Sequence, residues 1–160
     1  YPIVGIDLIQ SKLEMAKIFG VSHAFVGSDD LESCVETIRE VVGQHGADVV
    51  VDTTGIARVI ESAYELTHPD GKTILVGVPR KGDNISIYSL PLHFNKILTG
   101  SEGGDSIPHI DIPRYIRLYQ TGKFNLNGLV THEFSLDEVN DAIDMVRSGE
   151  CGRCMIDMTL

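Results

Sequence analysis

An acidic residue ends the first apolar run of this sequence, Ile3–Asp7, just before a predicted helix. A carboxylate at the C-terminal end of a parallel strand can accept two hydrogen bonds from the ribose hydroxyls of a dinucleotide. Its charge would also repel a 2′-phosphate, so Asp7 favours NAD over NADP. The alternative is that Asp7 only caps the turn that follows it. Lys12 could reach the same ribose or its phosphates, although an exposed helix lysine is the plainer interpretation of its spacing.

Two further segments with ligand-binding chemistry follow apolar runs later in the chain. They are Asp52-Thr53-Thr54-Gly55 and Val76-Gly77-Val78-Pro79. Open parallel sheets bind ligands at the carboxyl ends of their strands, so we expect both segments to lie along one binding edge. Gly55 and Gly77 have no Cβ, so a flat ring or a sugar could approach the backbone there. Each glycine alone is equally well explained as a turn residue.

Residues typical of metal or nucleophilic catalysis do not form a recognisable set. Cys151 and Cys154 make a C-x-x-C, but no second pair or nearby histidine completes a zinc site. The pair follows a predicted helix, whereas a thioredoxin-type motif places its first cysteine at a helix N-terminus. The six histidines lack metal-ligand spacing, and neither G-x-S-x-G nor H-E-x-x-H occurs. We therefore predict no catalytic residue and no metal ligand in this chain.

The composition of the 160 residues narrows the class of protein further. A formal net charge of −10 argues against a nucleic-acid partner or an anionic membrane surface, because both need clustered lysine and arginine. Three cysteines are too few for a disulfide framework, which favours a reducing compartment. No apolar run reaches the roughly 18 residues of a membrane span, and no signal peptide is evident. We expect a cytoplasmic protein.

Short apolar strands alternate with amphipathic helices along most of the chain. We predict strands at Ile3–Asp7, His23–Val26, Ala47–Thr53, Thr73–Val76 and Lys96–Gly100. The three consecutive valines from Val49 indicate a strand buried on both faces, as in a parallel sheet. The alternation predicts an α/β fold of the Rossmann type, a doubly wound parallel sheet with helices on both faces.

Two S-x-x-E sequences predict helix starts. Ser11 and Glu14 would form a capping box that opens the first helix, and Ser135 and Glu138 would form a second. The helix after Ser135 is expected to end at Gly149, where glycine can adopt the left-handed conformation of a helix terminus. Residues 105–160 read as a C-terminal helical tail with one or two short strands.

Five segments, in order along the whole chain, match the pattern of a known family. They are V-G-I-D through K-L-E-M-A-K-I-F-G-V (Val4–Val21), D-V-V-V-D-T-T-G (Asp48–Gly55), G-K-T-I-L-V-G-V-P (Gly71–Pro79), T-G-S-E-G-G (Thr99–Gly104) and Leu129–Cys154. The last is the most specific, since it follows the family's "I-T-H … L-x-E-I-x-x-A-F … G" pattern and ends in a basic residue. By these segments the chain resembles the zinc-type, medium-chain alcohol dehydrogenases.

The resemblance implies a role for each candidate in binding NAD. Asp7 would bind the adenosine ribose with help from Lys12, and Arg153 would reach the pyrophosphate. Thr53, Thr54 and Gly55 would border the adenosine half of the cofactor. The nicotinamide would lie beside Val76, Gly77 and Val78, whose backbone groups would orient its carboxamide. Ser101 and Glu102 would sit near the same ring.

The same resemblance implies that the chain is the later part of a longer enzyme. The glycine-rich turn, the first strand and the zinc ligands of the family would all lie before Tyr1. Residues 1–104 would be the NAD-binding Rossmann portion, incomplete at its N-terminus, and residues 105–160 would pack back on the catalytic domain. In the strand order 3-2-1-4-5-6 the missing strand is central, so two of the remaining strands would each lack a partner. We expect this chain alone to bind no zinc and to be inactive.

The implied parent protein transfers hydride between an alcohol or aldehyde and NAD, with an upstream zinc polarising the alkoxide. Family members pair near Lys96–Gly100, which implies a homo-dimer or homo-tetramer. Three alternatives remain open: a zinc-independent quinone or enoyl reductase, a methyltransferase that uses S-adenosylmethionine, and a non-catalytic nucleotide-binding module. Asp7 counts against the reductases, which usually prefer NADPH, and the tail with Ser135 and Arg153 counts against the methyltransferase.

Overall fold

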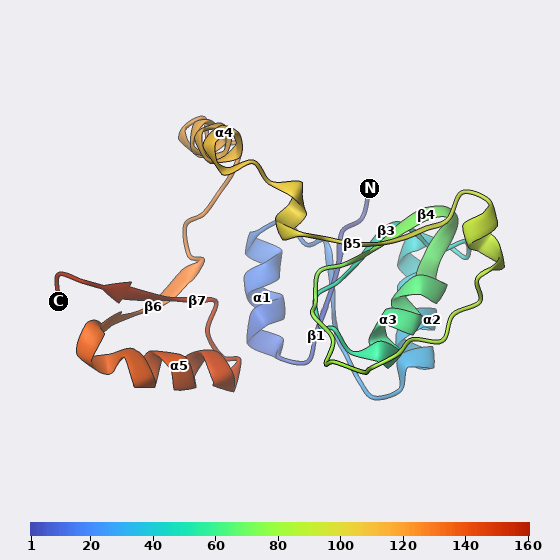
Figure 1. Cartoon of the computed structure of the whole chain (residues 1–160), viewed down its shortest axis with the longest axis horizontal. Helices are drawn as coiled ribbons and strands as arrows, with labels where there is room; N and C mark the ends of the chain where they lie inside the picture. Colours follow the sequence, from blue (N-terminus) through green and yellow to red (C-terminus); the bar gives the residue numbers. More distant parts are fainter. The chain divides into compact units, whose positions relative to one another are not determined.

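The computed structural model describes residues 1–160, which form two compact units. The terminal unit contains residues 1, 3–26 and 107–160, and the central unit contains residues 2 and 27–106. Figure 1 follows the chain through both units, from blue at the N-terminus to red at the C-terminus. All strand pairs are parallel, which confirms the predicted α/β class. No helix has both the length and the apolar character needed to cross a bilayer.

The terminal unit begins with a strand, a helix and a second strand. β1 (Val4–Asp7) pairs in parallel with β2 (His23–Val26), and α1 (Gln10–Ile18) connects them and contacts both. Leu13 is the buried residue of α1. β1 is paired on one side only, as predicted for a strand that lacks a neighbour. The register places Asp7 opposite Val26, at the carboxyl ends of the two strands.

The predicted capping box at Ser11 and Glu14 is wrong. α1 starts at Gln10, and the preceding residue makes no side-chain cap. Asp7 fixes the turn instead, since its Oδ1 accepts a hydrogen bond from the Ile9 N–H at 2.9 Å. The helix therefore begins before Ser11, which lies inside its first turn. Glu14 pairs along the helix surface, where it accepts hydrogen bonds from the side chains of Gln10 and Lys17.

The rest of the terminal unit contains α4 (Pro108–Gln120), β6 (Val130–Ser135), α5 (Val139–Ser148) and β7 (Arg153–Asp157). β6 and β7 form a parallel pair, so residues 105–160 hold two short strands as well as helices. The second capping box is confirmed, because Glu138 Oε2 accepts hydrogen bonds from the Ser135 N–H at 2.9 Å and hydroxyl at 2.8 Å. α5 ends at Gly149 with φ 76°, in the left-handed conformation.

The central unit is a three-stranded parallel sheet with two helices. Its strands are β3 (Ala47–Asp52), β4 (Thr67–Leu75) and β5 (Ile97–Gly100), in the order β3-β4-β5. α3 (Ala57–Leu66) packs on β3 and β4, and α2 (Leu31–Val42) packs on α3. Short 3-10 turns occupy Leu90–His93 and Gly103–Asp105. β4 starts earlier than the predicted strand Thr73–Val76, since it begins at Thr67 and includes the His68–Gly71 segment.

The core of the central unit lies between the helices and one face of the sheet. Its most buried apolar residues include Ile60 and Tyr64 of α3 and Ile38 of α2. The prediction that β3 is buried on both faces is wrong, because Val49 and Val51 are 57% and 52% exposed. Successive side chains of a strand point to opposite faces, so Val49 and Val51 share one face, while the half-buried Val50 and the buried Asp52 share the other.

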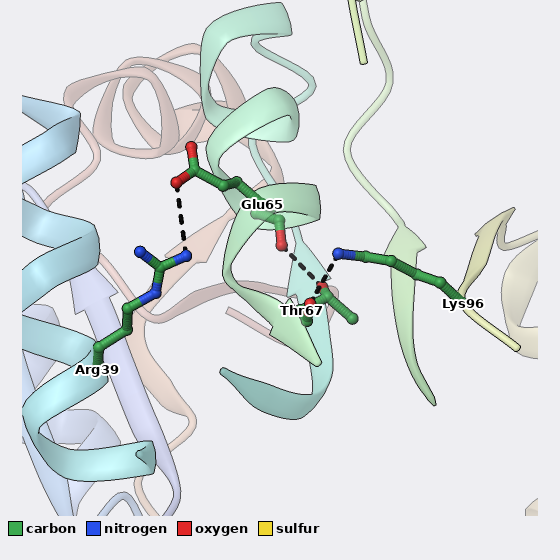
Figure 2. A network of polar contacts seen from close by, with 5 residues as sticks. Arg39, Glu65, Thr67 and Lys96 are labelled. Atoms are coloured by element: carbon green, nitrogen blue, oxygen red, sulfur yellow. Dashed lines mark hydrogen bonds and ion pairs between the residues drawn. The ribbon is translucent and has the colours of Figure 1, made fainter. Parts of the chain in front are cut away.

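A buried lysine holds the start of β5 against the start of β4 (Figure 2). Lys96 is 8% exposed, and its Nζ donates a hydrogen bond to the Thr67 carbonyl oxygen at 2.7 Å. The same ammonium lies 4.2 Å from the centroid of the Tyr64 ring, in a cation–π contact. Desolvation lowers the pKa of Lys96. Nearby, Arg39 of α2 pairs with Glu65 of α3 at 3.4 Å.

Candidate cofactor-binding site

The carboxyl ends of three neighbouring strands form one edge of the central unit. The register aligns Asp52 of β3 with Leu75 of β4, and Leu75 with Gly100 of β5. The loops that follow these three residues carry all the candidate residues predicted in this unit: Thr53, Thr54, Gly55, Val76, Gly77, Val78, Ser101 and Glu102. The structure therefore brings these eight residues to one sheet edge, as expected for an open parallel sheet.

A buried carboxylate shapes the loop after β3. Asp52 is 3% exposed, and its Oδ1 accepts hydrogen bonds from the Thr54 N–H at 3.1 Å and hydroxyl at 2.6 Å. Its Oδ2 accepts a third from the Gly55 N–H at 3.0 Å. Sequence reasoning named Asp52 only as a strand end and missed this role. The sequence does contain a signal for this role, since an aspartate side chain can accept hydrogen bonds from the residues that follow it and so fold T-T-G into a turn.

Two glycines allow the loops after β3 and β4 to meet backbone to backbone. A Cβ on Gly77 would lie 2.2 Å from the Gly55 nitrogen, and one on Gly55 would lie 2.6 Å from the Val78 carbonyl group. Gly55 also has φ 68°, which favours glycine. The N–H groups of Val76 and Gly77 both donate to the Asp52 carbonyl oxygen, at 2.8 and 3.0 Å. These glycines are therefore required by the contact between the loops, whatever binds beside them.

A hollow of about 340 Å³ opens beside this contact. Its volume lies in the range of small-ligand sites, which begins at roughly 300 Å³. Residues of both loops line it: Thr54, Gly55, Ile56, Val78, Arg80 and Asp83. Sequence reasoning did not include Ile56, Arg80 or Asp83 among the candidates, because surface loop residues carry no periodic signal. The lining combines backbone, apolar side chains and one charge of each sign, so it suits an amphipathic ligand.

The loop after β5 carries the last two candidates of this edge. Ser101 is half-buried, and its Oγ accepts a hydrogen bond from the Gly104 N–H at 3.1 Å. Glu102 is exposed at the start of the 3-10 turn Gly103–Asp105 and makes no side-chain hydrogen bond or ion pair. The Glu102 carboxylate is therefore free to meet a ligand, whereas the Ser101 hydroxyl is partly committed to its own turn.

The charged candidates Asp7, Lys12 and Arg153 belong to the terminal unit. Asp7 is half-buried at the end of β1, and Oδ1 serves the turn through the Ile9 N–H. Its Oδ2 accepts no hydrogen bond from the chain. Turn capping and ligand binding are therefore compatible at Asp7, since a carboxylate has about four acceptor positions.

Lys12 lies in α1, which touches the segment that precedes Arg153. A Cβ on Gly149, just after α5, would lie 3.0 Å from Ile9 Cδ1 and 4.0 Å from Lys12 Nζ. α1 thus packs against the segment that leads into β7, where Arg153 is the first residue and is exposed. Neither Lys12 nor Arg153 forms an ion pair with an acidic side chain of the chain. Both cations are available to an anionic ligand.

Metal-binding chemistry finds no support in the arrangement of side chains. No group of three or more histidine, cysteine, aspartate or glutamate side chains lies in a position to hold a metal ion.

Comparison with known proteins places the chain in a family. Residues 1–121 match the family described as zinc-binding dehydrogenase. The chain is 34% identical over 157 residues to alcohol dehydrogenase 1 of Trifolium repens, covering 98% of this chain and 41% of that protein. It is 31% identical over 160 residues to S-(hydroxymethyl)glutathione dehydrogenase of Paracoccus denitrificans, covering 96% of this chain and 42% of that protein.

Solved structures give the same result. The crystal structure of benzyl alcohol dehydrogenase from Acinetobacter calcoaceticus matches with a TM-score of 0.85 and 28% identity, covering 98% of this chain and 43% of that one. The crystal structure of an alcohol dehydrogenase zinc-binding domain protein from Burkholderia ambifaria matches with a TM-score of 0.84 and 27% identity, covering 96% of this chain and 40% of that one. The chain therefore spans about two-fifths of the proteins that it matches. It belongs to the zinc-binding dehydrogenase family, as its resemblance to the zinc-type, medium-chain alcohol dehydrogenases predicted.

Proposed function

We propose that this chain binds NAD and orients its nicotinamide for hydride transfer to or from an alcohol or aldehyde, as part of a longer zinc-type alcohol dehydrogenase. The observation that carries the proposal is the Asp7 carboxylate, half-buried at the carboxyl end of a parallel strand with Oδ2 unused. A carboxylate in this position is suited to ribose hydroxyls and repels a 2′-phosphate.

The other charged residues of the terminal unit suit the remainder of the adenosine half. Lys12 and Arg153 have no acidic partners in the chain, and α1 packs against the segment that precedes Arg153. In this proposal Lys12 supports the ribose and Arg153 neutralises part of the pyrophosphate charge. Thr53, Thr54 and Gly55 border the adenosine in the turn that Asp52 holds.

The nicotinamide would lie beside Val76, Gly77 and Val78, with Ser101 and Glu102 near the ring. The N–H groups of Val76 and Gly77 are already used by the Asp52 carbonyl oxygen. Val78 N–H donates no hydrogen bond within the chain, so it and the carbonyl groups of this segment are the groups left to orient the carboxamide. The bound cofactor supplies the hydride chemistry; the chain binds it and holds its ring in place.

The two parts of this chain would have different roles in the longer protein. Residues 1–104 would form the NAD-binding portion, and residues 105–160 would return to a catalytic domain that holds the zinc. No side-chain cluster of this chain fits that metal, so we assign no step of the reaction through zinc to its residues.

β5 is paired on one side only, by β4, which leaves an edge near Lys96–Gly100 for the proposed homo-dimer or homo-tetramer. We propose a cytoplasmic location.

The test uses Asp7→Asn in the full-length protein. Asparagine can still accept the hydrogen bond from the Ile9 N–H, so the turn should survive. Losing a hydrogen bond to a charged group costs about 1.5–3 kcal/mol, so the Kd for NAD should rise roughly 10-fold to 100-fold while binding of NADP is less affected. Titrations followed by fluorescence or calorimetry measure both constants.

Asp48→Asn is the matched control, because Asp48 is an exposed aspartate near the start of β3 and its side chain makes no hydrogen bond. Asp48→Asn should leave both Kd values unchanged. If Asp7→Asn also left them unchanged, Asp7 would not be part of the cofactor site.

A further inference from the structure

The connection between β4 and β5 (yellow-green in Figure 1) lines part of the hollow at the sheet edge. It contributes Val78, Arg80 and Asp83 to the lining. Ile56, the residue just before α3, lies in the lining as well. The proposed function places Val78 beside the nicotinamide and gives the two charged residues no role. Whether this part of the hollow is formed before a ligand arrives depends on what holds Arg80 and Asp83 there.

The turn that contains these two charged residues is not hydrogen-bonded to any other element. Its own hydrogen bond runs inside the turn, from the Asp83 N–H to the Arg80 carbonyl oxygen at 3.1 Å. Neither charged side chain forms an ion pair. Before the turn, the connection is held where Val76 and Gly77 donate to the Asp52 carbonyl oxygen. The position of the turn therefore depends on where the chain is held next.

Glu61 of α3 provides the next attachment. Its Oε1 accepts a hydrogen bond from the Ser86 N–H at 2.7 Å, three residues beyond Asp83. Tyr64 of the same helix then donates a hydrogen bond from its hydroxyl to the Tyr88 carbonyl oxygen at 3.0 Å. α3 thus holds the backbone of the connection at two neighbouring points, and the one at Glu61 is nearer to the hollow.

The same helix also begins at the hollow. α3 starts directly after Ile56, and Glu61 lies five residues beyond it. Residues within a helix keep fixed positions relative to one another. The hydrogen bond between Glu61 and Ser86 therefore sets the turn at Arg80–Asp83 relative to the part of the lining that precedes α3. Without this bond the two parts of the lining can move apart.

We propose that Glu61 is a positioning residue of the cofactor site, which acts through Ser86 to hold Arg80 and Asp83 at the hollow. This inference rests on the proposed function, which assigns NAD to this edge of the sheet. Glu61 itself does not touch the cofactor. Its loss weakens binding, because the ligand must then order a turn that the fold would otherwise hold in place.

Glu61→Ala in the full-length protein removes the acceptor and allows two measurements. Trypsin can cut after Arg80 and Lys81, which are both exposed. Without NAD, cleavage at these two sites should become several-fold faster in the variant, because local opening exposes the backbone to the protease. Mass spectrometry of the fragments gives the rate. The Kd for NAD, measured by calorimetry, should rise about 3-fold to 10-fold, as expected for the loss of one hydrogen bond.

Two further variants separate this role from a general loss of stability. Glu61→Gln keeps an oxygen that can accept from the Ser86 N–H, so both measurements should return toward the wild-type values. Glu65→Ala is the matched control on the same helix, because the Glu65 carboxylate pairs with Arg39 of α2 and not with the connection. It should leave the Kd for NAD and the trypsin cleavage rate unchanged.

The proposal is overturned if Glu61→Ala binds NAD as tightly as the wild type, since a purely structural role would change only the trypsin rate. It is also overturned if the trypsin rate is unchanged, if Glu61→Gln does not restore binding, or if Glu65→Ala weakens binding by the same factor. In each of these cases the wild-type protein still binds NAD, and the proposed function stands. If the wild type does not bind NAD, the proposed function fails and this inference fails with it.

Discussion

Gly77 lies so close to Gly55 that a Cβ on Gly77 would stand 2.2 Å from the Gly55 nitrogen. Real Cβ atoms do not approach a backbone atom this closely, so a side chain on Gly77 must push the two loops apart. The contact involves backbone on both sides, and a flexible side chain cannot relieve it. These two loops carry most of the proposed cofactor contacts. They can lie this close together only because Gly55 and Gly77 have no side chains.

Gly77→Ala should destabilise the protein and weaken NAD binding together. Overpacking of a close contact typically costs about 1–3 kcal/mol, and here the displaced atoms belong to the loops that would border the cofactor. Urea denaturation measures the free energy of unfolding, and titration with NAD measures the Kd. Gly100→Ala is the control at the neighbouring strand end, because a Cβ there has no atom within 4 Å. If Gly77→Ala and Gly100→Ala had the same free energy of unfolding and the same Kd for NAD, the close contact between the loops would be contradicted.

Asp52→Asn should loosen the turn after β3. The carboxylate accepts three hydrogen bonds from Thr54 and Gly55, and an amide offers one oxygen while turning an NH₂ group toward N–H donors. An unsatisfied buried group costs about 1–3 kcal/mol, and we expect a loss of stability in that range. Asp48→Asn, near the exposed start of the same strand, should lose little stability. A stable Asp52→Asn protein would show that the turn does not depend on the carboxylate.

The buried hydroxyl pair of Thr67 and Thr73 permits a double-mutant cycle. Their Oγ1 atoms are 2.7 Å apart, and Thr73 is fully buried with no other side-chain partner. Thr67→Val keeps the shape but leaves the Thr73 hydroxyl unsatisfied, so it should cost about 1–3 kcal/mol. The double variant with Thr73→Val should recover part of that loss, since neither hydroxyl then remains. If the double variant lost as much free energy of unfolding as the two single variants together, as measured by urea denaturation, the hydrogen bond between Thr67 and Thr73 would not contribute to stability.

The capping box at Ser135 predicts a pH dependence of stability. Hydrogen bonds from the backbone N–H and the hydroxyl of Ser135 lower the pKa of Glu138. A carboxylate with a lower pKa in the folded state stabilises the fold above its unfolded pKa, which is about 4.3. That contribution disappears as the pH falls through the folded value.

Wild type should therefore be more stable than Glu138→Gln at neutral pH, and the difference should shrink as the solution is acidified below pH about 4. Thermal unfolding followed by circular dichroism at several pH values gives the comparison. Glu133→Gln is the control, because Glu133 is exposed on β6 and its side chain makes no hydrogen bond. A difference between wild type and Glu138→Gln that does not change with pH would contradict the role of the ionised carboxylate.

The two S-x-x-E sequences show where local reasoning succeeds and where it fails. Ser135 and Glu138 form the predicted box at the 3-10 turn Leu136–Glu138, which leads directly into α5. Ser11 and Glu14 do not, because the Asp7 carboxylate folds the preceding turn and α1 begins earlier. The same motif thus has different outcomes, decided by a neighbouring hydrogen bond that the motif does not include.

The sequence by itself determined the alternation of parallel strands and helices, the family, and the segments that reach the carboxyl edge of the sheet. These depend on short-range patterns: apolar runs, turn residues and glycine positions. Only the tertiary structure showed that Asp52 holds its loop from a buried position, that Lys96 is buried against Thr67, and that Gly55 and Gly77 let two backbones meet. Burial and contact distance depend on residues far apart in the chain, and no local pattern contains them.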